Sequence, residues 1–84
     1  MQAFYLLFQD RDDYLSTAKS LGLLVQGQTG NGQTDWFPAP GYTFAEVGPD
    51  MDGHWMVNML AERLPDGLPV IDSPANPRQK FAGF

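Results

Sequence analysis

The stretch Ala3-Phe-Tyr-Leu-Leu-Phe-Gln9 decides the fold, because it is apolar on both sides of an extended chain. Alternate residues of a strand point to opposite faces. Here one face would carry Phe4, Leu6 and Phe8, and the other Ala3, Tyr5 and Leu7. A strand that is apolar on both faces belongs in the middle of a sheet or is covered on each face. The stretch therefore predicts a central strand.

A short helix is predicted directly after this strand. Asp10 is a good N-cap, and Asp13 three residues later supplies an aspartate version of the capping box. Gly22 stands where a left-handed residue ends a helix. Between these signals the apolar positions form a single stripe, made of Tyr14, Leu15, Ala18 and Leu21.

The rest of the chain predicts short strands. Residues 23–25 and 35–37 would form a hairpin around the glycine-rich segment 26–34, which contains the turn signal Asn31-Gly32. Strand-like alternation recurs over residues 41–47 and 54–60, with a turn between them, and Val70-Ile71 can add a last short strand. Residues 62–69 have room for no more than one helical turn before proline ends it.

The order of elements predicts an α+β fold: a small, mostly antiparallel sheet with one short helix packed on one face. All 84 residues form a single domain, in which 26–34 is a flexible loop and 72–84 an extended C-terminal arm. A single helix leaves the other face of the sheet with little to cover it. That face is therefore expected to bind something.

The charge balance excludes several classes of partner. Ten acidic residues face five basic ones, which are scattered along the chain, so neither nucleic acid nor an anionic membrane is expected as a partner. No apolar stretch approaches the roughly 20 residues of a membrane span. The start of the chain lacks the basic region of a signal peptide. We expect a product that stays in the cell or leaves it inside a larger particle.

Few residues offer site chemistry. The chain has no cysteine, and His54 is the single histidine, which excludes a thiolate or multi-histidine metal site. No serine lies in a nucleophile elbow, and the glycines of segment 26–34 lack the lysine of a phosphate-binding loop. Asp50-x-Asp52-Gly53 resembles the beginning of a calcium loop, but no glutamate closes it, so a solvated turn is favoured. We expect no enzyme, no cofactor and no metal.

The aromatic residues leave two alternatives open. Trp36, Phe37, Tyr42, Phe44 and Trp55 can fill the core of a domain that has no disulfide or metal to stabilise it. Alternatively, some of them, above all Trp36 and Phe37 beside two prolines, stay exposed and anchor a partner. At the C-terminus, cationic and aromatic residues could dock the arm on the sheet or on a neighbour. The candidate partner-binding residues are Trp36, Phe37, Tyr42, Trp55, Arg78, Phe81 and Phe84.

From Gly53 onward four stretches stand out: His54-Trp-Met-Val-Asn-Met-Leu60, Leu64-Pro65, Val70, and Pro74-Ala-Asn-Pro77-Arg78-Gln-Lys-Phe81-Ala82-Gly83. In these stretches the chain resembles a group of small proteins encoded among the tail genes of tailed bacteriophages. The strand and helix from Phe4 to Leu21 resemble the family's beginning. The order Gly53-His-Trp55 differs from the family's Gly-Trp-His. The resemblance implies a virion or virion-assembly role and transfers no catalytic residue.

Three functions follow as hypotheses. The first is a non-enzymatic structural or accessory protein of a bacteriophage virion, made in the host cytoplasm and docked on a tail-tip, baseplate or fibre component. Its partners would be other virion proteins, with self-association as a further option. The second is an acidic phage-encoded inhibitor that binds a host protein. The third is a carbohydrate-binding module in which Trp36 and Trp55 are stacking platforms.

Overall fold

Eight helices and strands follow one another in the computed structural model, which describes residues 1–72, 74 and 77–81. They are β1 (Gln2–Phe8), α1 (Arg11–Ser20), β2 (Leu24–Gln28), β3 (Thr34–Pro38), β4 (Thr43–Pro49), β5 (Trp55–Ala61), β6 (Val70–Ile71) and α2 (Pro77–Phe81). Residues 62–69 form turns and extended chain, so the helical turn that they had room for is absent.

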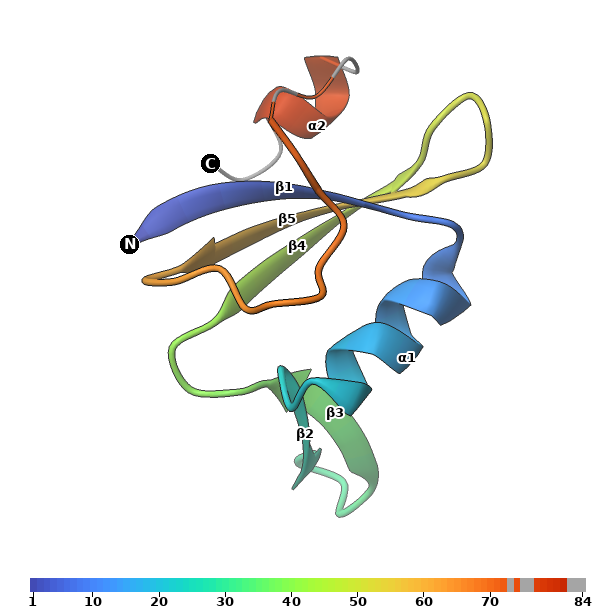
Figure 1. The fold of residues 1–84 in the computed structure, drawn as a ribbon. Helices are drawn as coiled ribbons and strands as arrows, with labels where there is room; N and C mark the ends of the chain where they lie inside the picture. Colours follow the sequence, from blue (N-terminus) through green and yellow to red (C-terminus); the bar gives the residue numbers. More distant parts are fainter. Residues whose placement is uncertain (73, 75–76, 82–84) are drawn as a thin grey trace.

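Four strands form an antiparallel sheet in the order β4-β5-β1-β6. β1 lies inside it, as its two apolar faces predict, and pairs with β5 from Gln2↔Ala61 to Phe8↔Trp55. A second sheet consists of β2 and β3 alone. Figure 1 shows the four-stranded sheet with α1 and the β2–β3 hairpin on one side and α2 on the other. The predicted α+β fold with a small, mostly antiparallel sheet is confirmed.

The core lies between α1 and the face of the sheet that carries Leu6 and Val57. Both side chains are fully buried, and the two residues are neighbours across β1 and β5. Tyr14 and Ala18 cover them from α1. The other buried members of this cluster are Phe8, Leu23, Leu24, Met59 and Ala61. Burying this apolar surface is the main stabilising contribution in a domain without disulfides.

The ends of α1 follow the predicted signals. The Asp10 side chain accepts a hydrogen bond from the Asp13 amide at 2.7 Å, as an N-cap does. At the other end Leu23 N donates to Ala18 O and Gly22 N to Lys19 O, the two bonds of a Schellman motif. Gly22 has φ of 74°, which only glycine adopts readily. These local bonds explain why the sequence predicts this helix well.

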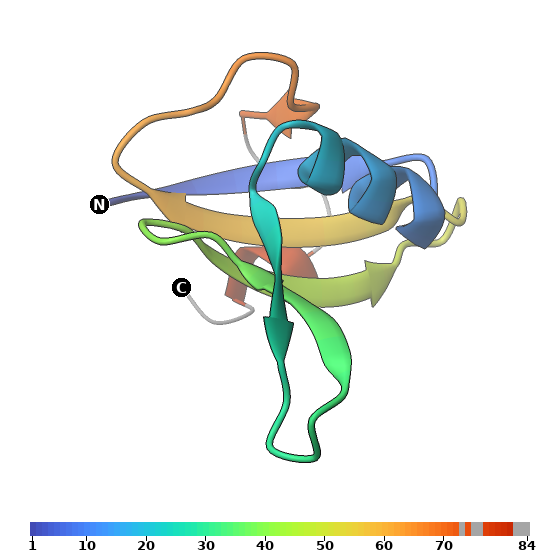
Figure 2. The same cartoon turned by 90° about the horizontal axis from the view of Figure 1, so that it is seen from below.

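The predicted hairpin is present, but its strands are longer than expected. β2 continues to Gln28 and β3 begins at Thr34, so both predicted bounds of the flexible loop, 26 and 34, are wrong, and the connection covers only residues 29–33. The remaining turn is closed by Thr29 N, which donates to Gln33 O at 2.7 Å. Figure 2 shows the hairpin crossing below the sheet, with its tip extending past β4. We call this hairpin, residues 24–38, the arm.

The second face of the sheet is less open than predicted. α2 lies across this face. The C-terminal segment is thus helical at Pro77–Phe81, and the prediction of an extended C-terminal segment over residues 72–84 is wrong there. Proline is compatible with the first turn of a helix, because the amide it lacks has no partner there. Beneath α2, Met56 and Asn58 of β5 are buried. The expectation that this face has little to cover it is therefore wrong around β5.

Candidate docking surface

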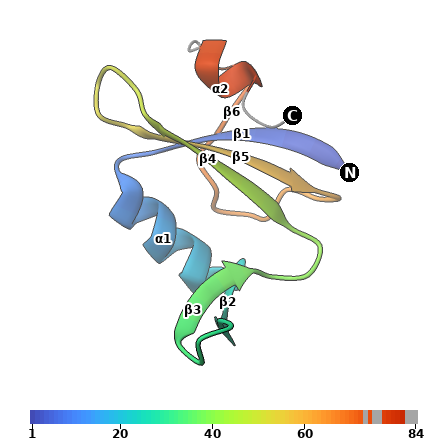
Figure 3. The ribbon, with the colours of Figure 1, turned by 180° about the vertical axis from the view of Figure 1, so that it is seen from behind.

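The arm carries two exposed aromatic side chains. Trp36 and Phe37 of β3 are 37% and 40% exposed, and Val25, which pairs with Phe37 on β2, is 42% exposed. Val25 and Phe37 lie on one face of the hairpin, because they are cross-strand partners, and Trp36 lies on the other. The first face of the arm thus carries two partly exposed apolar side chains. Figure 3 shows β3 on the outside of the molecule.

A glycine allows Phe37 to lie flat on the arm. A Cβ atom at Gly27 would stand 2.9 Å from Cδ2 of the Phe37 ring, which is closer than carbon atoms approach. The ring therefore covers the backbone of the neighbouring strand. Any side chain at position 27 would displace it.

Trp36 faces α1 across a groove of about 450 Å³. Lys19 Nζ lies 4.6 Å from the centroid of the Trp36 ring, a cation–π contact that joins the arm to the last turn of α1. Side chains of both signs line the groove: Arg11 and Lys19 from α1, Asp35 from β3 and Glu46 from β4. Its apolar lining consists of Tyr14, Leu15, Leu24, Trp36, Pro38 and Phe44.

Glu46 also lines this groove and accepts two hydrogen bonds there. Its Oε1 accepts hydrogen bonds from Arg11 Nε and from Trp55 Nε1, each at 3.0 Å, and so joins α1, β4 and β5. Burial, and secondarily the negative charge of Glu46, raises the pKa of Tyr14 to about 12, while Arg11 acts in the opposite direction. Tyr14 is therefore a neutral phenol at ordinary pH, packed against Phe44 with ring centroids 6.0 Å apart.

The other aromatic candidates belong to the core. Tyr42 and Trp55 are partly buried and pack against the core cluster, as does Phe44. Tyr42 stacks on Phe44 with ring centroids 6.5 Å apart and an angle of 12° between the planes. Each of the two alternatives for the aromatic cluster therefore applies to part of it. These three residues pack on the core, whereas Trp36 and Phe37 are exposed.

Arg78 and Phe81 belong to α2, which lies on the opposite face of the sheet from the arm. Arg78 is exposed on α2, and a Cβ atom at Gly48 would stand 3.7 Å from Arg78 Nη2, so the guanidinium group lies near β4. Phe81 ends α2, and Phe84 lies outside the described residues. The candidates on the arm, in the core and on α2 therefore form no single surface.

Two buried amides hold α2 on the sheet, and neither is among the candidate residues that the sequence suggests. Gln79 is 1% exposed, and its Nε2 donates to the backbone carbonyl of Leu6 in β1 at 2.9 Å. Asn58 of β5 is fully buried, and its Nδ2 donates to the Gln79 carbonyl. Buried polar groups are stabilising only when hydrogen-bonded, so these bonds fix where α2 sits. The asparagine within the apolar run 55–60 was a signal for Asn58; none pointed to Gln79.

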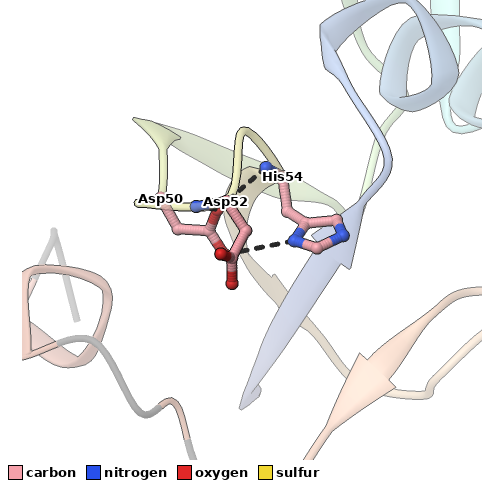
Figure 4. Close-up of side chains that lie close together, drawn as sticks. All are labelled: Asp50, Asp52 and His54. Atoms are coloured by element: carbon pink, nitrogen blue, oxygen red, sulfur yellow. Dashed lines mark hydrogen bonds and ion pairs between the residues drawn. The ribbon is translucent and has the colours of Figure 1, made fainter.

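Asp50, Asp52 and His54 meet in the turn between β4 and β5 (Figure 4). Each offers one ligand atom, and these atoms lie within 4.8 Å of one another, so the three could hold a divalent cation. The arrangement is also what the turn itself requires. Asp50 Oδ1 accepts hydrogen bonds from the amides of Asp52 and His54, at 2.9 and 2.8 Å.

The charge state of Asp50 reflects these bonds. Desolvation acts to raise the pKa of Asp50, but the two amides and the neighbouring His54 outweigh it and lower the pKa below its ordinary value. His54 Nδ1 stands 3.4 Å from Asp50 Oδ2. The solvated turn that the sequence favours accounts for all of these contacts.

Charge is distributed unevenly between the arm and the rest of the molecule. Between residues 20 and 45 the chain has a single charged residue, Asp35. Depletion of charge together with enrichment in aromatic residues is typical of the centre of a protein interface. The arm has both properties.

Neither helix in the described part of the chain is long and apolar enough to cross a membrane. Comparisons with protein-family models, with curated proteins and with solved structures found no match to this chain.

Proposed function

We propose that this chain is a non-enzymatic structural or accessory protein of a bacteriophage virion, and that it docks through its arm on a tail-tip, baseplate or fibre component. The observation that carries the docking proposal is the exposure of Trp36 and Phe37 on a projecting, almost uncharged hairpin. The virion setting rests on the sequence resemblance described above.

The arm is a weak structural element by itself, because it consists of only two strands. A two-stranded ribbon is marginally stable in water unless its faces are covered. The arm is anchored at its base, where Leu23 and Leu24 are buried, whereas Val25, Trp36 and Phe37 directly beside the base leave part of their large apolar side chains in water. Covering them with a partner surface would stabilise both the arm and the complex.

The first experiment asks whether the protein is in the particle. Mass spectrometry of purified virions from the phage that encodes this chain should detect it at a fixed ratio to a tail protein. Its absence from virions, with the protein present in infected cells, would end the structural proposal.

The second experiment asks whether the arm makes the contact. Trp36→Ala and Phe37→Ala should reduce incorporation at least tenfold while leaving the far-ultraviolet circular dichroism spectrum unchanged. Met51→Ala is the matched control, because Met51 is an equally apolar but fully exposed residue in the β4–β5 turn. Normal incorporation of both arm variants would assign docking to another surface.

A second candidate function, the acidic inhibitor of a host protein, is favoured by one observation. The Phe8↔Trp55 pair brings the start of α1 and the β4–β5 turn to the same end of the sheet. Acidic side chains gather there: Asp10, Asp12 and Asp13 from one segment and Asp50 and Asp52 from the other. An inhibitor would be captured with a basic host protein from infected cells, and Asp12→Lys would weaken that capture.

The carbohydrate-binding proposal has less support. Trp36 already has the Lys19 ammonium group over its ring, and Trp55 is partly buried and bonded to Glu46. A sugar would therefore meet one accessible ring instead of the two stacking platforms that the proposal needs. Binding on a glycan array that Trp36→Ala abolishes would restore it.

A further inference from the structure

The edges of the two sheets differ in how they are protected against pairing with another chain. Unprotected edge strands are templates for a further strand, and proteins block them with charges, prolines, bulges or short length. β4 has a bulge between Glu46 and Gly48, and it ends at Pro49. β6 is two residues long. Both edges of the four-stranded sheet are thus protected.

The direction of the backbone groups on the arm follows from two hydrogen bonds. Thr29 N donates to Gln33 O at one end of the β2–β3 ladder, and Ala39 N donates to Leu23 O at the other. Residues that bond across an antiparallel ladder alternate with residues whose N–H and C=O groups point away. On β3, the outward-pointing residues are Thr34, Trp36 and Pro38. On β2, they are Leu24, Gln26 and Gln28.

The outer edge of β3 is blocked. The amide of Trp36 donates to Asp35 Oδ1 at 2.8 Å, so its hydrogen is already engaged. Pro38 has no amide hydrogen. Of its three outward-pointing residues, β3 could therefore offer only the N–H group of Thr34 to an added strand.

The outer edge of β2 has none of these protections. Leu-Val-Gln-Gly-Gln contains no charge and no proline, and its pairing with β3 is regular from Leu24↔Pro38 to Gln28↔Thr34. Across the described ranges, the outward N–H and C=O groups of Gln26 and Gln28 form no hydrogen bond. Both residues are exposed. This edge is ready to accept another strand.

We propose that the strand it accepts is β2 of a second copy, paired antiparallel about a two-fold axis at Gln26. In this register Gln26 lies opposite its own counterpart, and Leu24 lies opposite the second copy's Gln28. Gln26 then falls in a hydrogen-bonded pair with its counterpart, and Gln28 in one with the second copy's Leu24, so the exposed outward groups of Gln26 and Gln28 gain partners on both copies. The two hairpins become one four-stranded sheet in the order β3-β2-β2-β3.

The chemistry of the edge favours a second copy over a charged partner. β2 is neutral, so a basic strand would find no acid to pair with, whereas a second copy brings the same neutral amides. The single charged residue of each arm is Asp35, which lies on the outer strand. The two Asp35 side chains would be separated by three strand spacings, at least about 14 Å, which exceeds the Debye length of roughly 8 Å at physiological salt.

The side chains also fit this register. Val25 falls opposite the second copy's Gly27, where there is no side chain to collide with it. A two-fold axis perpendicular to the sheet places Val25 and Phe37 of both copies on the same face, where their exposed surfaces adjoin. This assembly does not depend on the proposed virion role, since it can be measured on the purified chain.

The first test is the mass in solution. Sedimentation equilibrium should show the wild-type chain shifting from 9.3 kDa toward twice that mass as its concentration rises toward about 1 mM. Gln26→Pro removes an outward N–H but no bond to β3, so it should stay monomeric. Thr34→Pro is the matched control, because it removes an outward N–H from the edge of β3 and should dimerise like the wild type.

The second test probes the two-fold register. Gln26→Lys and Gln26→Glu should each be monomeric, because like charges would face each other across the axis. An equimolar mixture of the two variants should form a heterodimer that 1 M salt weakens. A wild-type chain that stays at 9.3 kDa up to about 1 mM, a Gln26→Pro variant that dimerises normally, or a mixture that stays monomeric would each overturn the proposal.

Discussion

The clearest quantitative prediction concerns the stability of the fold at alkaline pH. Tyr14 lies against Phe8 and Phe44 in the core, and its pKa is raised from 10.0 to about 12. The folded state therefore holds the phenolic proton more tightly than the unfolded chain does. The stabilisation that this provides is complete below pH 10 and is lost as the pH rises from 10 to 12.

The size of the effect follows from the shift. Each unit of pKa corresponds to about 1.4 kcal/mol, so the shift of the Tyr14 pKa from 10.0 to about 12 corresponds to nearly 3 kcal/mol in the free energy of unfolding. Tyr14 also lines the groove beside Arg11 and Glu46, where water reduces the penalty of ionisation. We therefore expect a loss of about 2 kcal/mol in the free energy of unfolding. That is a large part of the stability of a domain this small.

The measurement compares the wild type with Tyr14→Phe. Phenylalanine keeps the ring contacts and removes the ionisable group, so the two proteins should have similar urea unfolding curves at neutral pH. Between pH 10 and 12 the wild type should lose about 2 kcal/mol more than the variant. Ultraviolet titration of the wild type should show a phenolic ionisation near pH 12 that Tyr14→Phe lacks. Equal losses in both proteins would refute the argument.

Three further predictions test other parts of the molecule. Gly27→Ala should displace the Phe37 ring, which a Cβ would approach to 2.9 Å, and the changed chemical shifts of that ring would report it; unchanged shifts would mean that the close approach does not exist. Gln79→Ala should cost about 2 kcal/mol in urea unfolding, because it removes a buried hydrogen bond and its packing, and amide exchange should rise in α2; an unchanged exchange rate would show that the bond to Leu6 does not hold the helix. Asp50→Asn should remove a contribution to stability that is present above the ordinary carboxyl pKa and is lost as the pH falls through the lowered one; unfolding curves in acid that are parallel for wild type and variant would contradict this.

The sequence predicts the elements whose signals are local. The two apolar faces of β1 and the capping residues Asp10 and Gly22 lie within a few residues of the structure they determine, and both elements are found as expected. β2 was predicted too short because Gln26-Gly-Gln28 has low strand propensity. Its pairing with β3, with Phe37 over Gly27, overrides that propensity.

The features that escaped prediction depend on contacts distant in the sequence. α2 is held by the hydrogen bond from Gln79 to Leu6, two residues that are 73 positions apart, and no local sequence pattern predicts this bond. The contact of Lys19 with Trp36 and the bond of Arg11 to Glu46 likewise join residues from different elements. For the candidate site, the sequence could identify the aromatic residues as a set. Which of them stay exposed depends on the path of the hairpin, which composition does not specify.

The central position of β1 has a consequence for how the chain is made. During synthesis β1 leaves the ribosome before β5 and β6, with which it pairs, and before the buried Gln79. The four-stranded sheet therefore cannot form until Ile71 has emerged, several seconds after β1 at usual rates of translation. During that time the apolar residues of β1 have no native partner strand. Any chaperone or early binding partner that protects this protein is expected to act on β1.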